Sequence, residues 1–143
     1  MNNNVHVAML FSAFVLMSGL AVAHHGDAGR YDETLVTVTG KVVEIRLVNP
    51  HSVLVFDAPD PLANGKVTRW QAELGGGQQL IRQFGWNKEL PKIGDTITLI
   101  GRRVKSGAPY MNMTERANIV LTDSGKEIFR TQNFGQPAEP AKP

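Results

Sequence analysis

The sequence contains no cysteine among its 143 residues. This absence excludes disulfides, zinc–thiolate sites, iron–sulfur clusters, a thiol nucleophile and a lipid-modified cysteine at the N-terminus. Net charge is also small, because 15 Lys and Arg residues against 13 Asp and Glu residues give +2. A basic stripe for nucleic acid or an acidic tail is therefore not its dominant feature. With 42% hydrophobic residues, the composition is that of a globular protein of about one domain.

Catalytic motifs are scarce as well. His51 is the only histidine in the expected folded region, and its neighbour Ser52 would point to the opposite face of a strand, so the two form no nucleophile–base pair. Asp57 and Asp60 lie in a Pro-rich segment, where carboxylates cap backbone amides more often than they share a proton. Residues 75–77 are glycines without the Lys and Ser/Thr of a phosphate-binding loop. We expect neither enzymatic activity nor nucleic-acid binding.

The first 23 residues have the pattern of a secretory signal peptide. Residues 5–20 are almost wholly apolar, and Ala21, Val22 and Ala23 form an A-x-A cleavage signature, although no Lys or Arg precedes them. An uncleaved anchor is the alternative, disfavoured because the apolar run is shorter than the roughly 20 residues that span a bilayer. Cleavage after Ala23 would place the protein in the periplasm or outside the cell, with no permanent membrane anchor and with His24 as its first residue.

Alternation of apolar and polar residues predicts β-strands along most of the remaining chain. Residues 35–48 read as a long strand whose apolar phase changes next to Gly40, which indicates a β-bulge or a bend. A turn at Asn49 and Pro50 leads to a returning strand over residues 52–57, and residues 67–74 form a third strand with Trp70 pointing inward.

The period changes after the three glycines. Leu80, Ile81 and Phe84 fall on one face of a helix of about two turns, and Gly85 is placed to end it. Strands resume over residues 95–104 and 110–121, the latter interrupted at Glu115, and a short strand is expected near residues 126–129.

Three strands, a short helix and two strands are the element order of a five-stranded, OB-fold-like Greek-key barrel in a mainly all-β protein. An SH3-like barrel or an irregular β-sandwich is the rival, but neither predicts a helix between the third and fourth strands. We expect a mobile mature N-terminus over residues 24–34, a barrel over residues 35–130 and a Pro-rich disordered tail over residues 131–143.

Several segments in order resemble a known family. They are His24-His25-Gly26, the block TGKVVEIRLVNPHSVLVF, the block RWQAELGGGQQLIRQFGW and the block IGDTITLIGR. This series is similar to the short secreted bacterial proteins catalogued as domain of unknown function 6152, over about residues 24–128. The resemblance implies a secreted small β-barrel without an established activity.

Histidine and methionine positions raise the possibility of a metal site. A chain that begins at His24 has a free α-amine, of reference pKa about 8, beside the imidazoles of His24 and His25, and nitrogen ligands of this kind suit Cu(II). His51 is the candidate third arm, and Met111 and Met113 offer thioethers to Cu(I). Each has a structural alternative: a polar terminus for the first two histidines, a turn residue for His51 and core filling for the methionines.

An organic or protein ligand is the wider alternative. The open face of an OB-like barrel would bind it, with Arg69, Arg102, Arg103 and Trp86 as candidate contacts, although Trp86 also reads as an aromatic cap after the helix. We therefore expect an exported binding or accessory module for an unknown exported protein or small ligand, with copper binding as the named alternative.

Overall fold

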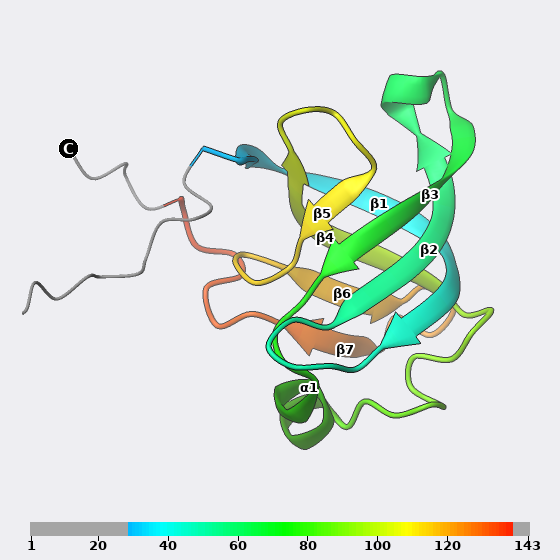
Figure 1. The fold of residues 1–143 in the computed structure, drawn as a ribbon, viewed down its shortest axis with the longest axis vertical. Helices are drawn as coiled ribbons and strands as arrows, with labels where there is room; N and C mark the ends of the chain where they lie inside the picture. Colours follow the sequence, from blue (N-terminus) through cyan, green and yellow to red (C-terminus); the bar gives the residue numbers. More distant parts are fainter. Residues whose placement is uncertain (1–28, 139–143) are drawn as a thin grey trace, which may run out of the picture.

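The computed structural model describes residues 29–138, which form a β-barrel with one short α-helix beneath it (Figure 1). None of the helices in this part of the chain is long and apolar enough to cross a membrane. The elements, in chain order, are β1 (Tyr31–Arg46), β2 (Val53–Asp60), the 3-10 helix η1 (Pro61–Ala63), β3 (Lys66–Glu73), α1 (Gly77–Phe84), β4 (Thr96–Val104), β5 (Tyr110–Asn112), β6 (Asn118–Leu121) and β7 (Glu127–Arg130).

Five of the strands close the barrel in the expected OB-like order. β1, β2 and β3 form an antiparallel meander, β3 pairs in parallel with β5, and β4 pairs antiparallel with both β5 and β1. The helix α1 lies between β3 and β4 in the chain and covers one end of the barrel (Figure 1). The expected all-β barrel with one short helix is therefore confirmed.

The change of phase in the first strand is a β-bulge. Pairing between β1 and β2 shifts its register between Val42 and Glu44, so β1 bends and pairs with β2 on one edge and with β4 on the other. Gly40 lies where the strands approach closely, since a Cβ there would be 2.6 Å from the Asp57 carbonyl oxygen. The strand begins at Tyr31, four residues before the expected start, because Tyr31 pairs with Val104 and is 1% exposed.

The interrupted last strand is also present. β5 and β6 pair with successive parts of the same edge of β4, through Arg102 with Asn112 and through Ile100 with Asn118. Residues 113–117, which include Glu115, separate them. The hairpin of β6 and β7 then continues the sheet past the closed barrel.

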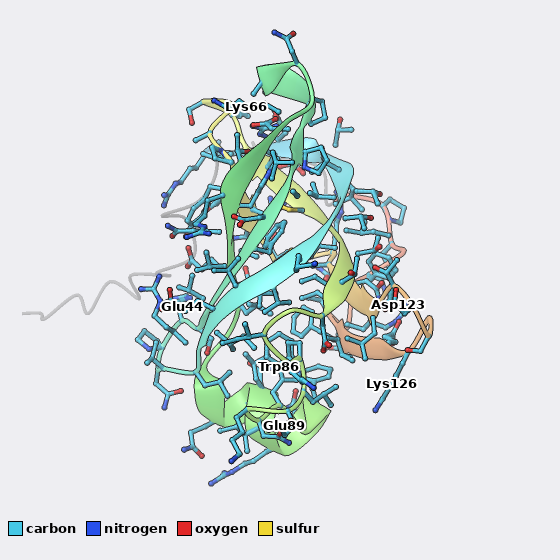
Figure 2. The ribbon with its side chains drawn as sticks, turned by 90° about the vertical axis from the view of Figure 1, so that its right-hand side faces the viewer. Glu44, Lys66, Trp86, Glu89, Asp123 and Lys126 are labelled. Carbon is cyan, nitrogen blue, oxygen red and sulfur yellow. The ribbon has the colours of Figure 1, made fainter. Side chains whose placement is uncertain are left out.

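The core fills the barrel and the space between the barrel and α1. Leu80 is fully buried and Phe84 packs on the core, whereas Ile81, expected on the same face, is 45% exposed. Gly85 ends α1 with φ of 71°, as expected. Figure 2 shows Trp86 between the helix and the strands. Further core side chains are Val38, Val42, Leu54, Phe56, Trp70, Ala72, Leu74, Ile97, Leu99, Met111, Met113, Ile119, Ile128 and Phe129.

The chain remains ordered past the predicted start of the tail at residue 131. The Thr131 backbone donates to the Ala117 carbonyl, and its hydroxyl accepts from the Ala117 amide at 2.8 Å. Turns follow, closed by hydrogen bonds from Phe134 to Thr131 and from Gln136 to Asn133. This segment packs beside β6 because hydroxyl and amide side chains satisfy its backbone and the backbone of its neighbours.

Candidate functional site

A polar cluster lies on the outer face of the barrel, where β3 ends. Glu73 points outward because its neighbours Ala72 and Leu74 are fully buried and side chains alternate along a strand. One oxygen of Glu73 lies 3.1 Å from Nδ1 of His51, and the other accepts a hydrogen bond from the Tyr110 phenol. We call His51, Glu73 and Tyr110 the Glu73 cluster.

Three elements position these side chains. His51 follows the turn at Asn49 and Pro50. Its neighbour Ser52 is held in place by two hydrogen bonds, from its backbone N–H to the Gly75 carbonyl and from its hydroxyl to the Val48 carbonyl. Tyr110 begins β5 and pairs with Gln71 of β3, on the outward parity that Glu73 shares. The carboxylate therefore receives one contact from the β1–β2 turn and one from β5.

The electrostatics keep the phenol protonated. Partial burial, together with the hydrogen bond to the Glu73 carboxylate, raises the pKa of Tyr110 well above its ordinary value. A protonated phenol donates to one carboxylate oxygen and leaves the other for the imidazole. An imidazole that donates Nδ1–H to this carboxylate has its lone pair on the second ring nitrogen, Nε2, where it can bind a ligand. The His51 side chain is 54% exposed.

The start of the barrel lies against the same cluster. The Arg30 guanidinium sits 5.4 Å from the centre of the Tyr31 ring and 5.7 Å from that of Tyr110, and the two rings stack at 6.5 Å. Arg30, the residue before β1, therefore packs on Tyr110, whose phenol donates to Glu73.

The two candidate methionines lie elsewhere. Met111 pairs with Ala72 on the inner face of the sheet, and both Met111 and Met113 are fully buried in the core. The structure thus separates them from His51 by the thickness of the sheet, because neighbouring residues of a strand alternate between its faces. His24, His25 and the cleavage residue Ala23 lie outside the described residues. Within residues 29–138, no group of three or more His, Cys, Asp or Glu side chains is arranged to hold a metal ion.

The four residues expected on a ligand face do not share a surface. Arg69 lies on the outer face of β3 and forms a bidentate pair with Asp57 at 2.9 and 3.0 Å. Trp86 is 1% exposed, and its indole N–H donates to the Ile128 carbonyl at 2.7 Å, so it joins α1 to β7 instead of facing a ligand. Arg102 and Arg103 are consecutive on β4 and point to opposite faces, so they form no common basic patch.

Both arginines of β4 form ion pairs with carboxylates of the same domain. Arg103 is 6% exposed, binds both carboxylate oxygens of Asp60 at 2.8 Å and lies 4.5 Å from the centre of the Trp70 ring. Arg102 binds Glu115 at 2.8 Å and lies over Tyr31. Sequence reasoning missed the Arg103–Asp60 pair, although it correctly expected Asp60 to cap a backbone amide, that of Leu62 at 2.9 Å.

A groove of about 860 Å³ runs between α1 and the segment after β7. Amides are the commonest side chains in its lining, where five of them occur. We call it the amide groove; the five amide residues are Gln79, Gln83, Gln132, Asn133 and Gln136. Sequence reasoning missed this groove because it assigned residues 131–143 to a mobile tail, although the frequency of Gln and Asn in residues 78–83 and 132–136 was a visible signal.

In a comparison with protein-family models, residues 13–111 match the family of unknown function DUF6152. The chain belongs to this family. A search of curated proteins finds no match. The DUF6152 match includes the whole Glu73 cluster and ends at Met111, so the β7 side of the amide groove lies beyond it.

Proposed function

We propose that this chain is an exported binding module whose ligand is a copper(II) ion, held by His51 together with His24 and His25. The ligands would be Nε2 of His51, the free amine and imidazole of His24 after cleavage behind Ala23, and the imidazole of His25. Nitrogen donors of this kind favour Cu(II), which binds most tightly of the first-row divalent ions.

The observation that carries the proposal is the contact between His51 and Glu73. Metal-bound histidines almost always donate their other ring N–H to a carboxylate or carbonyl, which fixes the ring and raises its basicity. Nδ1 of His51 lies 3.1 Å from Glu73, and Tyr110 holds the far oxygen of that carboxylate. The cluster therefore has the surroundings of a metal-ligating imidazole before any metal is bound.

The position of Arg30 supports the participation of the N-terminus. Arg30 packs on Tyr110, which bonds to Glu73, which contacts His51. Residues 24–29 are six residues, and an extended chain of that length spans about 20 Å. This reach allows His24 to return over the outer face beside His51. Met111 and Met113 take no part, because they belong to the core.

A Cu(II) titration of the chain that begins at His24 tests this proposal. We expect saturable binding, with His51→Ala weakening the affinity by well over tenfold, on the order of 2 kcal/mol or more. Glu73→Gln should weaken it by about 10- to 100-fold, the usual effect of losing the carboxylate behind a metal-bound histidine. Glu44→Gln is the matched control, because Glu44 is a half-exposed carboxylate on β1, separated from β3 by β2, and it pairs with Arg46.

Two results would contradict the copper site. One is identical weak binding in the parent and in both cluster variants. The other is unchanged affinity when the α-amine of His24 is acetylated, because the lone pair of that nitrogen is then delocalised into the new amide and no free amine remains. Metal-free protein that instead binds a component of the cell envelope would support the wider alternative of an organic or protein ligand.

A further inference from the structure

We propose that the amide groove is a second binding site, separate from the Glu73 cluster, and that it takes a neutral oligosaccharide. The groove lies at the helix end of the molecule, between α1, Thr114 and the residues that follow β7. Its volume of about 860 Å³ is within the range of ligand-binding clefts, roughly 300–1,000 Å³.

The charge of the groove excludes an anion as the preferred ligand. Among the described residues that line the groove, Arg130 alone is charged. Its Nε lies 3.0 Å from each carboxylate oxygen of Glu127, and its guanidinium covers the Phe134 ring at 4.7 Å. Because this cation is already compensated, no free charge remains to attract a phosphate, a carboxylate or an amine.

The polar side chains of the groove require a ligand that both donates and accepts hydrogen bonds. Each Gln and Asn amide carries two N–H donors and a carbonyl acceptor. Gln79 and Gln83 are linked to each other at 3.2 Å, and Asn133 accepts from the Arg116 amide, which orients these three groups. The side-chain amides of Gln132 and Gln136 make no hydrogen bond within residues 29–138. Sugar hydroxyls also donate and accept, so a polyol can bond to both the N–H groups and the carbonyl oxygens of these amides.

The apolar part of the lining that a ligand can reach is mainly Phe84. Phe84 is half-buried, and Phe129, which is 5% exposed, lies behind it with ring centres 5.0 Å apart and planes tilted by 52°. Aromatic rings beside amides form a surface that is apolar in one direction and polar in the other. A pyranose has the same two sides, with C–H groups on its face and hydroxyls at its rim.

Titration of the metal-free protein with maltotriose, cellotriose and tri-N-acetylchitotriose tests this site. The readout is the NMR spectrum of the side-chain amides. We expect at least one of them to bind saturably, with a Kd of about 1 mM or tighter, and to shift the amide signals of the groove. Gln83→Ala and Gln132→Ala should each weaken binding about tenfold or more. Gln78→Ala is the control, because Gln78 is on the same helix, is exposed and does not line the groove.

Three results would overturn the proposal. They are no saturation by any of the three sugars at about 10 mM, equal loss of binding in Gln78→Ala, and groove shifts caused by tetraglycine or phosphate but not by a sugar. Thermal melting of each variant separates lost binding from lost folding. Since the protein is metal-free in this experiment, its outcome is independent of the copper titration.

Discussion

Arg103 and Asp60 form a buried ion pair at the end of the barrel opposite α1. Two hydrogen bonds from the Arg103 guanidinium hold the pKa of the Asp60 carboxyl below its usual value. Asp60→Asn would leave the arginine charge buried without its partner, so we expect the free energy of unfolding to fall by about 3–5 kcal/mol. Urea unfolding measures this loss, and Asp57→Asn, which breaks the exposed pair with Arg69, should change it far less.

The same pair predicts a dependence of stability on pH. A folded pKa below the unfolded value of 3.8 means that the unfolded chain takes up the proton first as the pH falls. The stabilisation is therefore fully present above pH 3.8 and is lost as the pH falls through the lowered pKa. The difference in unfolding free energy between the parent and Asp60→Asn should be constant near neutral pH and shrink in acid. A constant difference down to the acid transition would contradict this assignment.

Tyr110 predicts the opposite behaviour in alkali. Its folded pKa is raised by burial and by Glu73, so the unfolded chain, with a pKa near 10.0, loses the proton first as the pH rises. The phenol contributes stability that is full below pH 10 and declines above it. Urea midpoints of the parent and of Tyr110→Phe should therefore stay parallel from pH 9 to 10 and converge from pH 10 to about 11. Parallel midpoints over the second of these intervals would show that the phenol is not held protonated.

Met111 distinguishes a core residue from a metal ligand. The side chain is fully buried on the inner face of β5, so Met111→Ala should reduce the free energy of unfolding by about 2–5 kcal/mol through the cavity it leaves. Copper affinity should stay unchanged at a temperature where the variant is folded. A selective loss of Cu(I) or Cu(II) binding would instead indicate that Met111 is a metal ligand.

At the scale of elements, the buried Trp86 after α1 connects the helix to the β6–β7 hairpin through a hydrogen bond to Ile128. Trp86 and Trp70 are each 1% exposed, but only Trp86 has an indole hydrogen bond within the described residues, to the Ile128 carbonyl. Trp86→Phe leaves that carbonyl unpaired at a cost of about 1–3 kcal/mol, whereas Trp70→Phe removes an N–H that has no such partner. The unfolding free energy of Trp86→Phe should be the lower of the two. Equal losses would mean that side-chain volume alone matters.

At the scale of the whole molecule, local pattern predicted the barrel well. The change of phase beside Gly40, the helical period of Leu80 and Phe84, and the interruption at Glu115 each report a local backbone event, and all three are present. Their order in the chain was sufficient to indicate the OB-like topology, since few folds place a helix between the third and fourth strands.

Contacts between distant residues were less accessible to sequence reasoning. Strand alternation separates Met111 from the outer face, whereas His51 and Ser52 precede β2 and differ in burial, His51 being exposed and Ser52 buried. Nothing local indicates that His51, Glu73 and Tyr110 meet. That meeting depends on the parallel register of β3 with β5, which is set by barrel closure. The burial of Arg103 and Trp86 was missed for the same reason, because their partners Asp60 and Ile128 are more than 40 residues away in the chain.

The most direct test of the copper proposal is the native intact mass of the protein recovered from the cell envelope. We expect a chain that begins at His24 and carries one copper ion, because cleavage after Ala23 would create the amine that completes the proposed site beside His51. A chain that begins elsewhere would contradict the proposed copper site, and so would a metal-free chain that takes up no copper at micromolar concentration.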